Sequence, residues 1–178
     1  MDRHFLRPVI LSVLFALITA RCSYQTNTIS EFLPVGGSQA PIFVGKTLDG
    51  KKISLASYQG HPVLINFWAS WCSPCRKEFP ELLALYEKYK DHGLQIVGIS
   101  IDDRTNKWIG AIRKDKLTWP QFIDEGPPFG GKASRLFNIR SLPSTFLVND
   151  KGVIIAENVT IDQIKNTVSR LLDAKKNN

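Results

Sequence analysis

Residues 63–101 read VLINFWASWCSPCRKEFPELLALYEKYKDHGLQIVGISI, and this stretch decides the fold. Its start, Val63–Trp68, is a short apolar run, which is typical of a parallel strand covered on both faces. A helix is predicted next, because apolar residues recur at helical spacing (Phe79, Leu82, Leu83, Tyr86 and Tyr89). The helix is predicted to end near His92-Gly93, since glycine commonly ends a helix. Leu94–Ile101 is a second apolar run. Strand, helix and strand in so short a segment predict a right-handed βαβ unit.

The second half of the chain has a different pattern. Thr105–Lys116 is predicted to be a helix, with its apolar side formed by Trp108, Ile109 and Ile112. Thr145–Val148 and Val153–Ala156 are separated by a turn-rich tetrapeptide, which predicts an antiparallel hairpin. A last helix starts at Thr160, whose spacing to Gln163 fits a capping box, and its buried stripe is Ile161, Ile164, Val168, Leu171 and Leu172. These elements predict an α/β fold with a mixed central sheet.

The N-terminus has the pattern of an export signal. Residues 1–8 carry Arg3 and Arg7, and the apolar run Val9–Ala20 follows them. This order is typical of a secretory signal peptide, which we place at residues 1–21. An uncleaved anchor is less favoured, because a membrane-spanning helix needs about 20 apolar residues.

Cys22 stands where a lipoprotein signal has its acylated cysteine, so it is a lipidation candidate. Arg21 departs from the lipoprotein pattern, and simple cleavage after Ala20 is the alternative. Residues 22–39 are predicted to be a tether or N-terminal extension, and residues 40–175 a single domain, since domains cluster at about 100–150 residues. All these alternatives imply export.

The charge pattern argues against nucleic-acid binding. The formal net charge of the 178-residue chain is +7. It falls to +5 without residues 1–21, which hold three arginines and one aspartate. The remaining basic residues are scattered among acidic ones and form no stripe interleaved with aromatic residues. We therefore expect no nucleic-acid partner, and membrane association only through the N-terminus.

The chain has three cysteines, and Cys72 and Cys75 are too close to stabilise a fold by closing a loop. A closed zinc site needs four ligands, and the three histidines and Cys22 do not cluster with this pair. Haem attachment requires a histidine after the second cysteine, where this chain has Arg76. We therefore interpret Cys72 and Cys75 as a redox-active pair, and we expect no metal and no cofactor.

Cys72 is the predicted nucleophile because it lies where the first strand ends and its helix begins. A helix N-terminus presents free N–H groups and a partial positive charge, which stabilise a thiolate. Cys75 lies one turn further and is the predicted resolving thiol. Pro74 suits the first turn, where no N–H is needed, whereas Pro80 lies deeper and predicts a kink.

Two motifs resemble the thioredoxin superfamily, and within it the exported TlpA/ResA-like, AhpC/TSA-type redoxins. The first is Asn66–Pro80 (NFWASWCSPCRKEFP) and the second is Ser141–Gly152 (SLPSTFLVNDKG). The resemblance spans about residues 40–175 and implies a thioredoxin-like three-layer α/β/α sandwich. It also implies that Pro143 is a cis-proline facing the disulfide, and that the backbone of Leu142 pairs with an extended substrate segment.

Further roles follow from the same resemblance. Thioredoxin has a buried acidic residue six positions before its first cysteine. This chain has Asn66 at that position, so another residue must transfer the proton. Glu78 matches the glutamate of the ResA-like group and is the predicted general acid/base for Cys75; the alternative is a solvated glutamate paired with Lys77 or with neighbours of Lys88. Trp71 and Trp68 are expected to shield the cysteines, although Trp68 also fits a plain core position. No chemistry is assigned to the loop 124–131.

The predicted function is a thiol–disulfide oxidoreductase that reduces protein disulfides in the bacterial periplasm or cell envelope through a Cys72–Cys75 dithiol/disulfide cycle. Its expected partners are protein thiol and disulfide substrates, with apocytochrome c as one candidate, and a membrane electron donor; we expect a monomer. One alternative is a thiol peroxidase, although peroxiredoxins have Thr or Ser where this chain has Ala69. Another is a non-catalytic binding module, which the intact cysteine pair disfavours.

Overall fold

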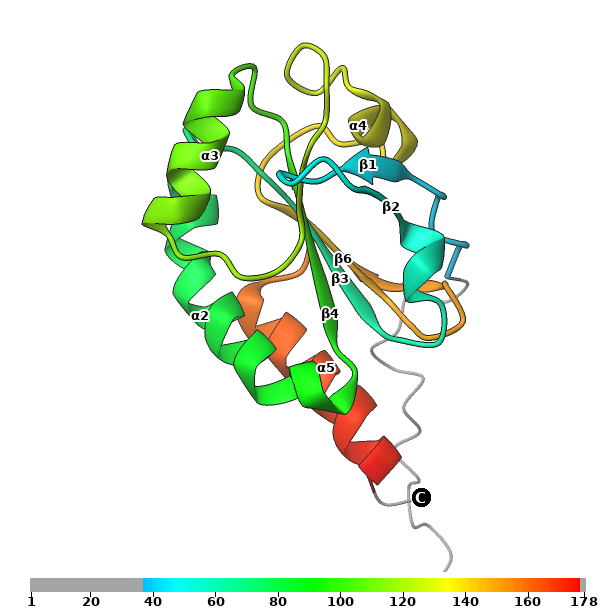
Figure 1. Cartoon of the computed structure of the whole chain (residues 1–178). Helices are drawn as coiled ribbons and strands as arrows, with labels where there is room; N and C mark the ends of the chain where they lie inside the picture. The colour runs from blue at the N-terminus through cyan, green and yellow to red at the C-terminus, as the bar shows by residue number, and fades with distance from the viewer. Residues whose placement is uncertain (1–36, 177–178) are drawn as a thin grey trace, which may run out of the picture. The chain divides into compact units, whose positions relative to one another are not determined.

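The core is built around one central strand, β3 (Val63–Trp68), whose six residues are all buried. The computed structural model describes residues 37–176 of the chain (Figure 1). β3 pairs in parallel with β4 (Gln95–Ser100), and β4 pairs in parallel with β5 (Gln121–Ile123). On its other side, β3 pairs with the antiparallel strand β6 (Ser144–Val148), which pairs with β7 (Ile154–Glu157). The sheet order is therefore β5-β4-β3-β6-β7, a mixed sheet as predicted.

Side chains alternate along β3, and both faces of the sheet are covered. Trp68 points toward α2 (Ser73–Tyr89), where its ring meets Phe79 at a centroid distance of 5.1 Å. Phe67 points the opposite way and packs on Phe137, which follows α4 (Lys132–Leu136), at 5.4 Å. The sheet is thus the middle of three layers.

The helices and the hairpin divide between the two faces (Figure 1). α2 is joined by α3 (Thr105–Lys114) and by α5 (Ile161–Lys176), whose Lys165 contacts Glu81 of α2 at 2.7 Å. The other face carries α4, a hairpin of β1 (Val44–Lys46) and β2 (Lys52–Ser54), and the short 3₁₀ helix η3 (Leu55–Tyr58).

The predicted elements are present, with ends shifted by one or two residues. The last helix begins with the predicted capping box, since the Thr160 N–H donates to Gln163 Oε1 at 2.9 Å and the Gln163 N–H to Thr160 Oγ1 at 3.4 Å. A second short 3₁₀ helix, η4 (Lys90–His92), leads to the predicted stop at Gly93, which has a φ of 94°. α2 continues through Pro80 to Tyr89, so the proline does not end it. β1, β2, β5 and α4 were not predicted from the sequence.

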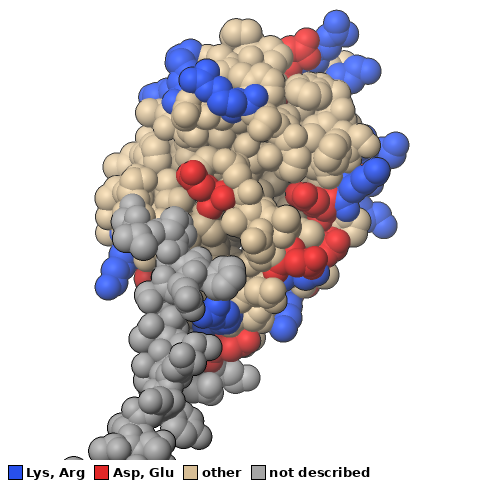
Figure 2. Space-filling view, turned by 180° about the vertical axis from the view of Figure 1, so that it is seen from behind, with Lys and Arg blue, Asp and Glu red and all other residues tan. Residues whose placement is uncertain are grey.

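Three predictions concern residues outside the described part: the signal peptide, most of the extension 22–39 and lipidation at Cys22. Within the described part, no helix is both long and apolar enough to cross a bilayer. On the face shown in Figure 2, lysines and arginines lie mostly at the margins with acidic residues among them, and they form no continuous stripe.

Candidate active site

Cys72 and Cys75 form a disulfide at the start of α2, with an S–S distance of 1.99 Å and a Cα–Cα distance of 5.4 Å. Cys72 is the N-cap residue, and its Sγ accepts a hydrogen bond from the Cys75 N–H at 3.2 Å. Pro74 occupies the first turn, where the helix needs no donor. Both cysteines are buried, with 4% of Cys72 and 1% of Cys75 exposed. The sulfur of Cys72 therefore satisfies one of the orphan N–H groups of the helix.

A buried carboxylate holds the turn that leads into the cysteines. Asp102, which follows β4, accepts hydrogen bonds from the Ser70 N–H at 2.8 Å, the Ser70 hydroxyl at 2.6 Å and the Ser100 hydroxyl at 2.7 Å. This residue was not predicted from the sequence. Its signal was its position, because β3 and β4 are parallel and their carboxyl ends meet at one edge of the sheet.

Arg76 ties the first turn of α2 to the end of α3. Its Nε and Nη2 donate to the two carboxylate oxygens of Asp115, both at 2.7 Å, and its Nη1 donates to the Ser70 carbonyl at 3.4 Å. The hydrogen bonds that Arg76 donates to Asp115 raise the pKa of Arg76, against the opposing effect of burial. This bidentate pair was also missed, since the partners lie 39 residues apart.

Glu78 lies three residues after Cys75 on the same side of α2. Within residues 37–176, its carboxylate has no hydrogen bond or ion pair, so the alternative of a pair with Lys77 or with a neighbour of Lys88 is not observed. Partial burial, and secondarily the charge of Glu81, raise the pKa of Glu78 above its usual value. An unpaired carboxyl with a raised pKa is suited to exchange protons.

The two tryptophans of the motif have different surroundings. Trp68 is fully buried, and its Nε1 donates to Gln121 Oε1 at 3.0 Å, so it belongs to the core. Trp71 is 55% exposed and lies at the surface beside Cys72. Asn66, two residues before Trp68, is also buried, and the atoms of its side-chain amide have no hydrogen-bond partner within the described residues.

The Leu142–Pro143 peptide bond is cis, as the resemblance implied. It directly precedes β6, in which Ser144 pairs with Phe67 of β3. Pro143 is therefore brought to the edge of the sheet at which β3 ends and the cysteine turn begins.

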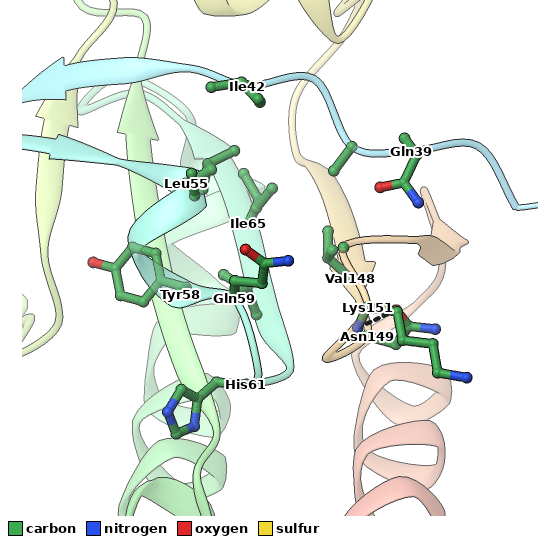
Figure 3. A pocket seen from close by; sticks show the side chains of 14 residues that line it. Gln39, Ile42, Leu55, Tyr58, Gln59, His61, Ile65, Val148, Asn149 and Lys151 are labelled. Carbon is green, nitrogen blue, oxygen red and sulfur yellow. Dashed lines mark hydrogen bonds between the residues drawn. The ribbon is translucent and has the colours of Figure 1, made fainter.

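Two other regions do not form part of this site. Asp124, the first residue of the loop 124–131, accepts hydrogen bonds from the N–H groups of Ala133 and Ser134, both at 2.8 Å, and so caps α4. A pocket of about 160 Å³ lies at the opposite end of β3 (Figure 3), where Tyr58, Ile65 and Val148 line it.

Nowhere in the described chain do three or more metal-ligating side chains cluster.

Comparisons with known proteins agree with this geometry. The AhpC/TSA family matches residues 36–157. The thiol-disulfide oxidoreductase ResA of Bacillus cereus is 36% identical over 156 residues, which cover 88% of this chain and 87% of ResA. The thioredoxin domain of a Bacteroides vulgatus thiol-disulfide oxidoreductase is 37% identical with a TM-score of 0.71, covering 76% of this chain and 96% of that domain. A solution structure of a thiol:disulfide interchange protein from Bacteroides sp. is 36% identical with a TM-score of 0.70, covering 77% and 90%.

The raised pKa of Glu78 predicts a pH-dependent stability. The folded protein binds this proton more tightly than the unfolded chain, so the carboxylate lowers stability at neutral pH, and this loss disappears as the pH falls below the ordinary pKa of 4.5. Glu78→Gln is expected to raise the urea midpoint of unfolding near neutral pH and to leave it unchanged in acid. Glu87→Gln is the control, because it removes a carboxylate of α2 that is paired with Lys90 and brings no such gain. A Glu78→Gln variant that is less stable at neutral pH would contradict this prediction.

The Arg76–Asp115 pair is expected to couple energetically. A double-mutant cycle with Arg76→Gln and Asp115→Asn, measured by urea unfolding, should give a coupling of about 1–2 kcal/mol, because the pair is bidentate and partly buried. The same cycle on the exposed pair Asp49–Lys51 should give a much smaller coupling, because solvent screens both charges. Equal couplings for the two pairs would show that the geometry around Arg76 contributes nothing.

Proposed function

The chain belongs to the AhpC/TSA family and is a thiol–disulfide oxidoreductase, and on this premise we propose that it reduces protein disulfides in the cell envelope. In this proposal, Cys72 is the attacking thiol and Cys75 the resolving thiol. The observation that carries it is the hydrogen bond from the Cys75 N–H to Cys72 Sγ. A sulfur that accepts from the free N–H groups of a helix start is stabilised as an anion, and the thiolate is the attacking species.

The proposed reaction proceeds in two exchanges. The Cys72 thiolate attacks one sulfur of the substrate disulfide, which breaks that bond, releases one substrate thiolate and forms a mixed disulfide. The Cys75 thiolate then attacks Cys72 Sγ and releases the second substrate thiolate. Two electrons have passed to the substrate, the two released thiolates take up protons, and the Cys72–Cys75 disulfide remains. A dithiol donor must reduce it again by the reverse exchange.

Glu78 is proposed to move the proton of Cys75. The Cys75 thiol must lose its proton before it can attack, and its side chain is almost completely buried from solvent. Glu78 is on the same side of the helix, has no competing partner among the described residues and has a raised pKa. It is thus the group best suited to accept that proton.

The docking position of the substrate is proposed from the sheet edge. Leu142 and the cis-proline Pro143 precede β6 beside the end of β3. An extended substrate segment can pair with the backbone of Leu142 and present its disulfide to Cys72. Trp71, Ser73 and Pro74 are exposed around the same opening.

The envelope location is proposed from the apolar segment Val9–Ala20 and the basic residues before it. A membrane dithiol donor then regenerates the enzyme, and apocytochrome c is a candidate client.

A redox titration against glutathione tests the direction of the reaction, since a strongly oxidising Cys72–Cys75 couple would contradict a role as reductant.

Cysteine variants test the two roles. Cys75→Ser is expected to accumulate mixed disulfides with client proteins through Cys72, because the second exchange cannot occur. Cys72→Ser should form none and should no longer reduce insulin. Cys22→Ser is the control and should reduce insulin at the normal rate. Insulin reduction by Cys72→Ser would rule out Cys72 as the nucleophile.

A Glu78→Gln variant tests the proton transfer. Resolution of a preformed mixed disulfide on Cys72 should slow by about 10²-fold near neutral pH and lose its pH dependence, which is the usual effect of removing a general base. Rapid-quench measurements across pH provide the rates. Glu87→Gln is the matched control on the same helix, because its charge does not shift the pKa of Glu78, and it should keep both rate and profile. If the two variants behave alike, Glu78 has no part in the step.

A further inference from the structure

A groove of about 580 Å³ opens between the cysteine turn and α3. Trp71 forms one wall, directly beside Cys72 in the chain, and α3 forms the other with Lys107, Gly110 and Lys114. No reaction step proposed above uses this groove. It is nevertheless continuous with the turn that carries the nucleophile.

The shape of the groove follows from the sequence of α3. Lys107 and Lys114 are seven residues apart and therefore lie on one face of the helix, with Ala111 between them. Gly110 has no side chain, and a Cβ atom built there would meet nothing within 4 Å. The helix surface between the two lysines is therefore open to an occupant.

The exposed charges of the groove are mostly positive. Arg104, Lys107 and Lys114 are all exposed, and the exposed carboxylate among the lining residues is Asp103, 3.9 Å from Arg104. Asp102 also lines the groove, but it is buried and its oxygens accept three hydrogen bonds. The charge of Arg76 is matched by Asp115. The N-terminus of α3 adds a further partial positive charge next to Arg104.

Trp71 adds an apolar contact at the same place. A tryptophan that is 55% exposed offers a large flat surface, and tryptophan is enriched among residues that dominate the affinity of interfaces. An occupant of the groove would thus meet an aromatic wall on one side and three cations on the other.

We propose that this groove binds an acidic segment of the client polypeptide next to its reactive cysteine, and so gives the enzyme a preference for clients with acidic flanks. This inference rests on the proposed function and adds the substrate class to it. Attraction between the groove and carboxylates raises the rate of encounter and orients the client over Cys72. The preference is therefore sensitive to salt.

Disulfide-bridged peptides that differ only in their flanking residues test this inference. The reduced enzyme should reduce the peptide with Glu flanks about fivefold faster than the one with Lys flanks at low salt, through faster encounter. The ratio should fall toward one as NaCl rises from about 20 mM to about 300 mM, because the screening length falls from about 20 Å to less than about 10 Å. Lys107→Glu/Lys114→Glu should reverse the preference. Equal rates for the two charged peptides, or a preference that survives the charge reversal, would overturn the inference.

Two controls separate this inference from the proposed function. Lys52→Glu/Lys151→Glu changes the net charge equally at exposed positions away from the groove, and it should keep the preference for Glu flanks. A cysteine-free acidic peptide should bind the oxidised enzyme and shift the backbone amide signals of Trp71, Lys107 and Lys114. If it binds there while no peptide is reduced, the proposed function fails and the groove assignment stands. If the peptides are reduced and it does not bind, the groove assignment fails alone.

Discussion

The structure depends on a sulfur atom that serves as a helix cap. A helix start leaves N–H groups without partners, and here Cys72 Sγ accepts from one of them. The position of that sulfur is fixed from two sides. Asp102 holds the turn before it through Ser70, and Arg76 holds the turn after it through Asp115. The position of Cys72 Sγ, the proposed nucleophile, is thus set by contacts between elements that are far apart in the sequence.

Burial of the two sulfurs limits what can react with them. Cys72 is only 4% exposed, so a substrate disulfide must be brought to it by a surface that surrounds the opening. Trp71 precedes Cys72 in the chain, and the Leu142–Pro143 segment lies at the edge of the sheet where β3 ends. Selectivity among clients then depends on the contacts that residues flanking the client's disulfide make beside Cys72 Sγ. The positive charge on α3 therefore affects which disulfides react.

The sequence predicted the central part of the fold because its signals are local. The apolar run at β3, the helical spacing along α2 and the capping box at Thr160 each lie within a few residues. β5 was missed because it has only three residues, too few to show a period. Asp102 and the Arg76–Asp115 pair join elements 32 and 39 residues apart. Such contacts become visible only when the strand order is known.

The two carboxyls near the cysteines are distinguished by their surroundings. Asp102 has its oxygens occupied by three donors, so it serves as a fixed acceptor that holds the turn. Glu78 has no such partner among the described residues, and burial raises its pKa. Gaining or losing a proton at Glu78 therefore disturbs no hydrogen bond of the site. The site needs one fixed acceptor and one carboxyl that can exchange a proton. Asp102 suits the first role because donors surround it, and Glu78 suits the second because they do not.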